Sequence, residues 1–232
     1  YLNGSLTLGG NKRHDAYFDA MAGGKYGYLR TSVSHNEAGN YKDGDGNRIH
    51  SSFERRNQML QLGLTPTENT LLTGTYERSR GEAAYADRMM DGSKFDRDAW
   101  NVRFVQRNIA PWFTELELRY GQSKIDHVMD TYSLRYLRMM GNQVKKAMNP
   151  KRETDTGHLK ATFDWSDINL QTGIDYMRDK HLARMEMRGE GYTHKPYQPQ
   201  QNFTQWGGFA EGAWTVNDSR KFIAGYRYDE VK

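Results

Sequence analysis

Segments of about ten residues in which apolar and polar side chains alternate recur along the whole chain. Because successive side chains of a strand point to opposite faces, a period of two predicts β-strands rather than helices. Short turns between consecutive segments favour antiparallel pairing. The pattern therefore predicts an all-β fold of about eleven antiparallel strands. Their apolar faces are marked by Leu6, Phe18, Leu29, Leu60, Leu72, Val102, Leu118, Phe163, Leu170, Ala210 and Phe222.

The connections between these segments alternate between short and long. Tight turns are expected near residues 24, 66, 110, 167 and 218. Long loops are expected near residues 37–51, 81–97, 127–155 and 181–202, and only the connection near 10–14 is brief. Outer-membrane β-barrels show this asymmetry, with short periplasmic turns and long extracellular loops. Trp112, Trp165 and Trp214 lie beside short turns, as an interfacial aromatic girdle requires. The pattern favours a transmembrane β-barrel of the bacterial outer membrane.

Composition agrees with a barrel, and the number of strands indicates its size. Of the 232 residues only 36% are hydrophobic while 12% are aromatic, which is less apolar than the core of a soluble domain of this length usually requires. No run of eighteen apolar residues exists, so a transmembrane helix is excluded. Bacterial single-chain barrels have even strand numbers, and the strand pattern extends to both ends of this chain. We therefore expect residues 1–232 to be one partial barrel domain, about half of a 22-stranded barrel, taken from a longer protein.

Charge, cysteine content and motifs exclude several classes of function. The chain has 33 basic and 29 acidic residues that are well mixed, so no basic face for nucleic acid is expected. It contains no cysteine, so it offers neither disulfides nor thiolate ligands. No Gly-x-Ser-x-Gly motif with an orienting acid is present, which argues against an enzyme of that type.

The most informative stretch covers residues 125–150 and begins with His127 and Met129. In an extended segment, residues i and i+2 project to the same side, so the imidazole and the thioether can hold one ion together. Soft ligands favour Cu(I). The pair therefore predicts a copper site in the long loop expected at 127–155. The alternative is that both side chains only pack.

Methionines are concentrated in the expected long loops, where binding residues are common. The alternative interpretation is that they fill gaps between loops or against a plug. His181, Met185 and Met187 form a second group, which we treat as accessory. The remaining histidines of strand and loop have no ligand-like neighbours at strand spacing and are expected to be surface or lumen residues. The loop methionines are Met89, Met90, Met129, Met139, Met140, Met148, Met185 and Met187, and the remaining histidines are His14, His35, His50, His158 and His194.

Residues 127–135, His-Val-Met-Asp-Thr-Tyr-Ser-Leu-Arg, together with Met139-Met140 and residues 147–150, resemble the TonB-dependent copper receptors. Residues 4–10 and the hairpin at 26–45 are similar to early barrel strands of the same family. The resemblance implies a 22-stranded outer-membrane barrel whose plug domain and remaining strands lie outside this chain. It also implies that His127 and Met129 bind copper, that the plug supplies further soft ligands, and that TonB is the energy-coupling partner. Met139, Met140 and Met148 match only in character.

The resemblance therefore implies an importer of Cu(I) or Cu(II). A siderophore receptor of the same fold is the alternative, with Tyr132, Arg135, Tyr136 and Arg138 available for an anionic iron chelate. A soluble carbohydrate-binding module with exposed tryptophans is a further alternative from a different class.

Overall fold

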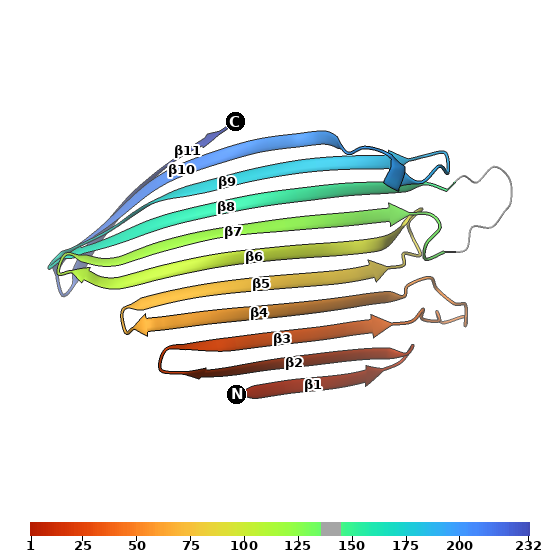
Figure 1. The fold of residues 1–232 in the computed structure, drawn as a ribbon, viewed down its shortest axis with the longest axis horizontal. Coiled ribbons are helices and arrows are strands. Elements are labelled where there is room, and N and C mark those ends of the chain that lie inside the picture. The colour runs from red at the N-terminus through yellow and green to blue at the C-terminus, as the bar shows by residue number, and fades with distance from the viewer. Residues whose placement is uncertain (136–144) are drawn as a thin grey trace.

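The computed structural model describes residues 1–135 and 145–232 as one antiparallel sheet of eleven strands, β1 to β11, each paired with its neighbours in chain order (Figure 1). The expected fold class and strand number are confirmed. A 3₁₀ turn, η1 (Tyr192–His194), lies in the connection before β10. The strands are β1 (Leu2–Gly9), β2 (Arg13–Gly24), β3 (Gly27–Ala38), β4 (Phe53–Thr67), β5 (Thr70–Ala83), β6 (Asp91–Ala110), β7 (Phe113–Asp130), β8 (Ala147–Trp165), β9 (Ile168–Glu186), β10 (Gln198–Asn217) and β11 (Arg220–Val231).

The short and long connections lie at opposite ends of the strands. All five turns predicted from the sequence are present, and the long connections lie together at the other end of the sheet (Figure 1). The expected loops at 81–97, 127–155 and 181–202 are wrong in extent, because the strands continue into them: β6 begins at Asp91, β7 ends at Asp130, β8 begins at Ala147 and β9 ends at Glu186. Backbone hydrogen bonds to equally long neighbouring strands extend these strands into segments where apolar and polar side chains no longer alternate.

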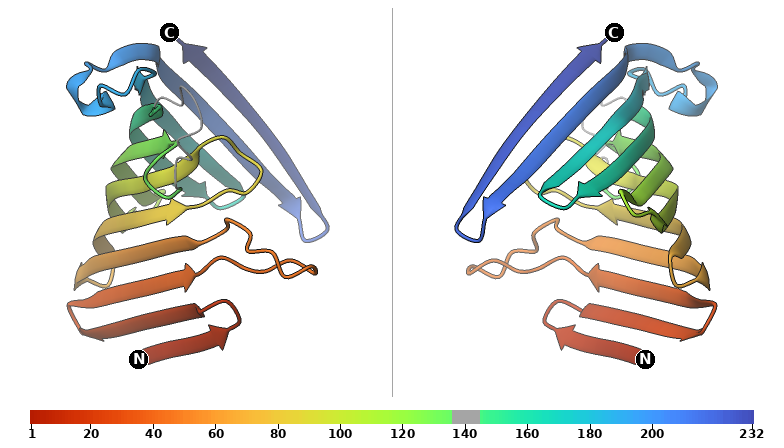
Figure 2. Two further views of the ribbon diagram at one scale, coloured as in Figure 1. Left: turned by 90° about the vertical axis from the view of Figure 1, so that its right-hand side faces the viewer. Right: turned by 90° about the vertical axis from the view of Figure 1, so that its left-hand side faces the viewer.

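The sheet is a single curved layer rather than a sandwich (Figure 2). Within the described residues β1 pairs with β2 and β11 pairs with β10, so the eleven strands form an open wall with two free edges. None of the described segments is a helix long and apolar enough to cross a membrane.

The outer face of the wall carries an apolar band between two aromatic belts. Trp206 and Trp214 project to the same face of β10, eight residues apart. That separation is about 27 Å along a strand, and a tilt of roughly 40° reduces it to about 20 Å, close to the apolar band of an outer-membrane barrel. The belt beside the long connections, here called the upper belt, comprises Tyr76, Trp100, Tyr120, Tyr176 and Trp206.

The inner face is polar and its charges are paired. Glu117 on β7 is only 2% exposed, and the Nε of Arg103 on β6 donates to its carboxylate at 2.8 Å. Arg119 pairs with the same carboxylate from two residues along the strand. The two arginines balance the charge of this buried carboxylate on the inner face. Alternation along β7 places every odd-numbered residue from 115 to 129 on this inner face.

Candidate metal site

His127 and Met129 lie near the end of β7, not in a loop as predicted. The strand continues to Asp130 because both neighbours extend beside it: His127 is the register partner of Phe95 on β6, and Met129 is the partner of Gly92. His127 lies seven residues beyond Tyr120 of the upper belt, which is about 24 Å along a strand. The pair therefore stands on the extracellular side of the apolar band.

The register with β8 keeps the two side chains on one face. Asp126 pairs with Lys151 and Met129 with Met148, so this register is the same before and after His127, whereas β6 has a bulge between Gly92 and Lys94. His127 and Met129 consequently share the inner face with Glu117, as the spacing of two residues predicted. The strand fixes their relative orientation more firmly than a loop would.

His127 is held as a neutral imidazole. Its ring lies against that of Phe95, with the ring centroids 4.5 Å apart. Its Nε2 is buried without a hydrogen-bond partner among the described residues. Burial lowers the pKa of His127 below its ordinary value, an effect that the neighbouring Asp126 carboxylate only partly opposes. A neutral ring with a free nitrogen is the form in which histidine binds metals.

A cavity of about 520 Å³ adjoins this histidine. Its walls come from four consecutive strands, β4 to β7, and include Phe53, Phe95, Arg97, Ile125 and His127. The lining includes both apolar rings and charged side chains. The cavity lies beside His127, whose Nε2 is itself covered by neighbouring atoms.

Phe95 reaches His127 because residue 92 is a glycine. A Cβ built on Gly92 would lie 2.0 Å from the Phe95 ring. Gly92→Ala is therefore expected to push the ring aside, at a cost of about 1–3 kcal/mol for local overpacking. The displaced ring would disturb His127 and weaken metal binding while the barrel still assembles. Metal titration of the full-length protein checks this, with Gly44→Ala, at a glycine in open space, as the control. Unchanged affinity would show that Phe95 does not position His127.

The structure brings together methionines that are distant in sequence. Met129 on β7 pairs with Met148 on β8, and Met148 pairs with Met185 on β9. Their side chains share the inner face, and those of Met148 and Met185 are 43% and 52% exposed. Their placement in loops was wrong, because β8 and β9 extend past them. These three residues are here called the methionine row.

The other candidate residues differ in their surroundings. His181 on β9 contacts Asp179, with 3.3 Å between Nε2 and Oδ2. Met187 follows β9 and is 48% exposed. Met139 and Met140 lie outside the described residues, as do Tyr136 and Arg138. The second His/Met group is thus divided between a strand and a connection.

Two buried carboxylates anchor the connections around the pair. Asp91, fully buried at the start of β6, accepts hydrogen bonds from Arg135, from His50 at 2.8 Å and from the backbone N–H of Tyr85. Arg135 also donates to the backbone carbonyls of Arg88 and Tyr85. Its donors are thus engaged within the protein, which argues against its use for an anionic iron chelate.

Asp130 is the second anchor, directly after Met129. Its carboxylate accepts from the hydroxyls of Ser93 and Ser133 and from the backbone N–H groups of Tyr132 and Ser133. Asp91 and Asp130 are register partners across β6 and β7. The end of the strand that carries His127 and Met129 is therefore fixed on both sides by buried hydrogen bonds.

Comparison with known proteins identifies the family. Residues 7–232 match the family described as TonB dependent receptor-like, beta-barrel. The chain therefore belongs to the TonB-dependent receptors, and its sheet is part of a larger outer-membrane barrel. This membership argues against the soluble carbohydrate-binding alternative. A search of curated proteins found no match.

Solved structures agree in fold and differ in sequence similarity. The copper transporter OprC superposes with a TM-score of 0.90 and 35% identity, covering 99% of this chain and 36% of that protein. The Serratia marcescens hemophore receptor HasR, solved as a double mutant with its hemophore HasA and heme, gives a TM-score of 0.75 at 15% identity, covering 99% of this chain and 33% of HasR. The alcaligin receptor FauA from Bordetella pertussis gives 0.66 at 13%, with 98% and 35% covered. The last two show the fold alone, and this chain spans about a third of each protein.

Proposed function

We propose that this chain is the copper-capturing part of the barrel of an outer-membrane copper importer. The observation that carries the proposal is His127, whose buried Nε2 has no partner among the described residues, beside Met129 on the inner face at the extracellular end. The 35% identity to a copper transporter over nearly the whole chain supports the same conclusion.

The chemistry of these two ligands suits copper. A thioether is a soft donor that prefers Cu(I), and the imidazole also accepts Cu(II), so the pair takes both oxidation states. Met148 and Met185 continue the row of thioether side chains from Met129 along the inner face. A Cu(I) ion could exchange between adjacent sulfurs of this row. Two protein ligands hold copper only weakly, so we expect the plug domain to complete the site with further soft ligands.

Transport requires parts of the receptor outside this chain. We expect a 22-stranded barrel, closed by the remaining strands and filled by the plug. Copper bound at His127 and Met129 lies between barrel wall and plug, so displacement of the plug by TonB would open a path for the ion. TonB, outer-membrane lipid and copper are the partners in this proposal.

Copper uptake by cells tests the proposed function. Cells that produce the full-length receptor are expected to accumulate more copper than cells without it, at copper concentrations too low for diffusion to supply. The excess should disappear in cells that lack TonB. Uptake of a ferric siderophore, with no TonB-dependent copper uptake, would favour the siderophore alternative instead.

A further inference from the structure

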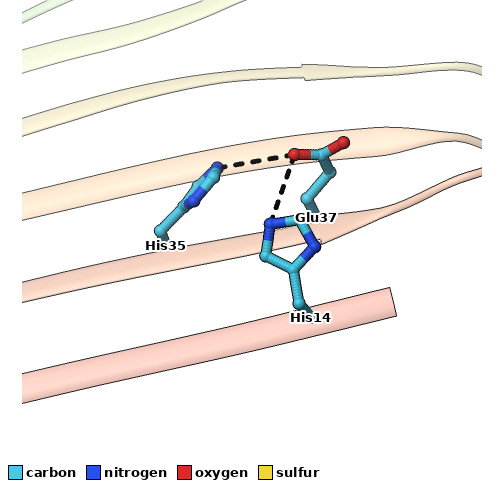
Figure 3. Close-up of side chains that lie close together, drawn as sticks. All are labelled: His14, His35 and Glu37. Carbon is cyan, nitrogen blue, oxygen red and sulfur yellow. Dashed lines mark ion pairs between the residues drawn. The ribbon is translucent and has the colours of Figure 1, made fainter. Parts of the chain in front are cut away.

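Two histidines and a glutamate meet on the outer face of the wall, near its N-terminal edge (Figure 3). His14 comes from β2, and His35 and Glu37 come from β3. Glu37 Oε2 lies 3.5 Å from His14 Nε2 and 3.8 Å from His35 Nε2. One ligand atom of each residue lies within 4.8 Å of the other two. The expectation that these histidines have no ligand-like neighbours was wrong.

The cluster lies beyond the apolar band and on the opposite face from His127. Register pairs connect Thr31 through Leu60 to Tyr76, so Thr31 is level with the upper belt. His35 lies four residues further toward the extracellular end, about 13 Å along the strand. Strand alternation places it with Thr31 on the outer face, where ions from the medium have access.

We propose that His14, His35 and Glu37 bind a borderline divalent cation, such as Zn²⁺, at a site separate from the copper pair. Two imidazole nitrogens and a carboxylate oxygen are ligands that Zn²⁺ and Cu²⁺ prefer, whereas Cu(I) prefers sulfur. Tetrahedral zinc with bonds of about 2.0–2.1 Å places its ligand atoms about 3.3–3.4 Å apart. The separations of 3.5 and 3.8 Å between Glu37 and the two histidines approach this value, and the two histidine nitrogens lie within 4.8 Å of each other.

The side chains can make the remaining adjustment. Those of His14, His35 and Glu37 are 39%, 31% and 44% exposed, so small rotations are not opposed by packing. Glu54 on β4 lies 3.0 Å from His35 Nε2 and is itself paired with Arg56. A metal ion bound at Nε2 would take the place of the hydrogen bond between His35 and Glu54. A bound ion would connect β2 and β3 and stabilise this edge of the wall in proportion to its occupancy.

Zinc titration of the full-length receptor tests the site. The starting protein carries His127→Ala/Met129→Ala, which removes the copper pair, so failure here is distinguishable from failure of the proposed copper function. Adding His14→Ala/His35→Ala is expected to abolish binding of about one Zn²⁺ per receptor and the accompanying rise in melting temperature. Glu37→Gln, which preserves the size of the side chain, is expected to weaken binding by about tenfold or more.

His194→Ala is the matched control, because this exposed histidine lies in η1 beside the long connections. It is expected to leave zinc stoichiometry and affinity unchanged. Equal zinc content in the starting protein, in the His14→Ala/His35→Ala variant and in Glu37→Gln would overturn the proposal and leave the cluster as ion pairs.

Discussion

Replacing His127 and Met129 together by alanine is expected to lower the copper affinity of the full-length receptor by about 100-fold or more. Loss of a residue that only supports a metal ligand already costs about 10–100-fold, and this change removes two ligands. Copper retained after dialysis in detergent, measured by elemental analysis, reports the loss. The barrel should assemble normally, because both side chains lie beyond the apolar band.

A matched control removes one methionine and one histidine elsewhere at the same end of the barrel. Met89 is 81% exposed in the connection before β6, and His194 is exposed in η1. Met89→Ala/His194→Ala is expected to keep wild-type copper binding. Equal retention by the His127→Ala/Met129→Ala variant and this control would mean that the pair only packs.

Replacing Asp91 by alanine is expected to release the connections around His127 and Met129. Breaking a buried ion pair by removing one partner costs about 3–5 kcal/mol, because the other partner stays buried without compensation. Here Arg135 and His50 would both lose their acceptor. Hydrogen exchange in the full-length receptor should rise in residues 39–52 and 84–90, while the strands of the membrane band keep their protection. Unchanged exchange in both connections would contradict this role of Asp91.

The same carboxylate predicts a pH dependence. Burial alone would raise the pKa of Asp91, but hydrogen bonds from Arg135, His50 and the Tyr85 backbone outweigh it and hold the pKa at about 2. A lowered pKa stabilises the folded state above the ordinary value near 4, and this contribution of about 2 kcal/mol is lost as the pH falls toward 2. The protection of the two connections, which is the exchange rate relative to that of an unstructured peptide at the same pH, should therefore stay constant from pH 7 to about 4 and fall below it. Asp91→Asn should remove this dependence.

The membrane part of the fold could be predicted from sequence, and its extracellular part could not. Between the aromatic belts one face contacts lipid, so side chains alternate and each strand is recognisable. Beyond the upper belt both faces are wet, and residues 91–97 show no alternation. Pro150 lies in the stretch expected to be a loop, and proline is unusual within strands. The structure nevertheless pairs Pro150 with Ala183 in the ladder of β8 and β9.

The part of the candidate site that lies within one strand could be predicted from residue spacing. Two residues in one strand share a face, so His127 and Met129 could be paired directly. Met148 joins Met129 only through the register across the long connection between β7 and β8, which sequence does not fix. Met185 then follows, because the short turn between β8 and β9 sets its pairing with Met148. His14 and Glu37 are different, because the two-residue turn between β2 and β3 sets their pairing. Counting outward from that turn would have placed them opposite each other.

Anomalous X-ray diffraction from copper-loaded crystals of the full-length receptor tests copper binding at His127 and Met129, because it locates the ion without assuming its ligands. We expect a strong copper peak within bonding distance, about 2.0–2.4 Å, of a His127 ring nitrogen and the Met129 sulfur, at the extracellular end of β7. A peak elsewhere in the receptor, with His127 still packed on Phe95 and unligated, would contradict it.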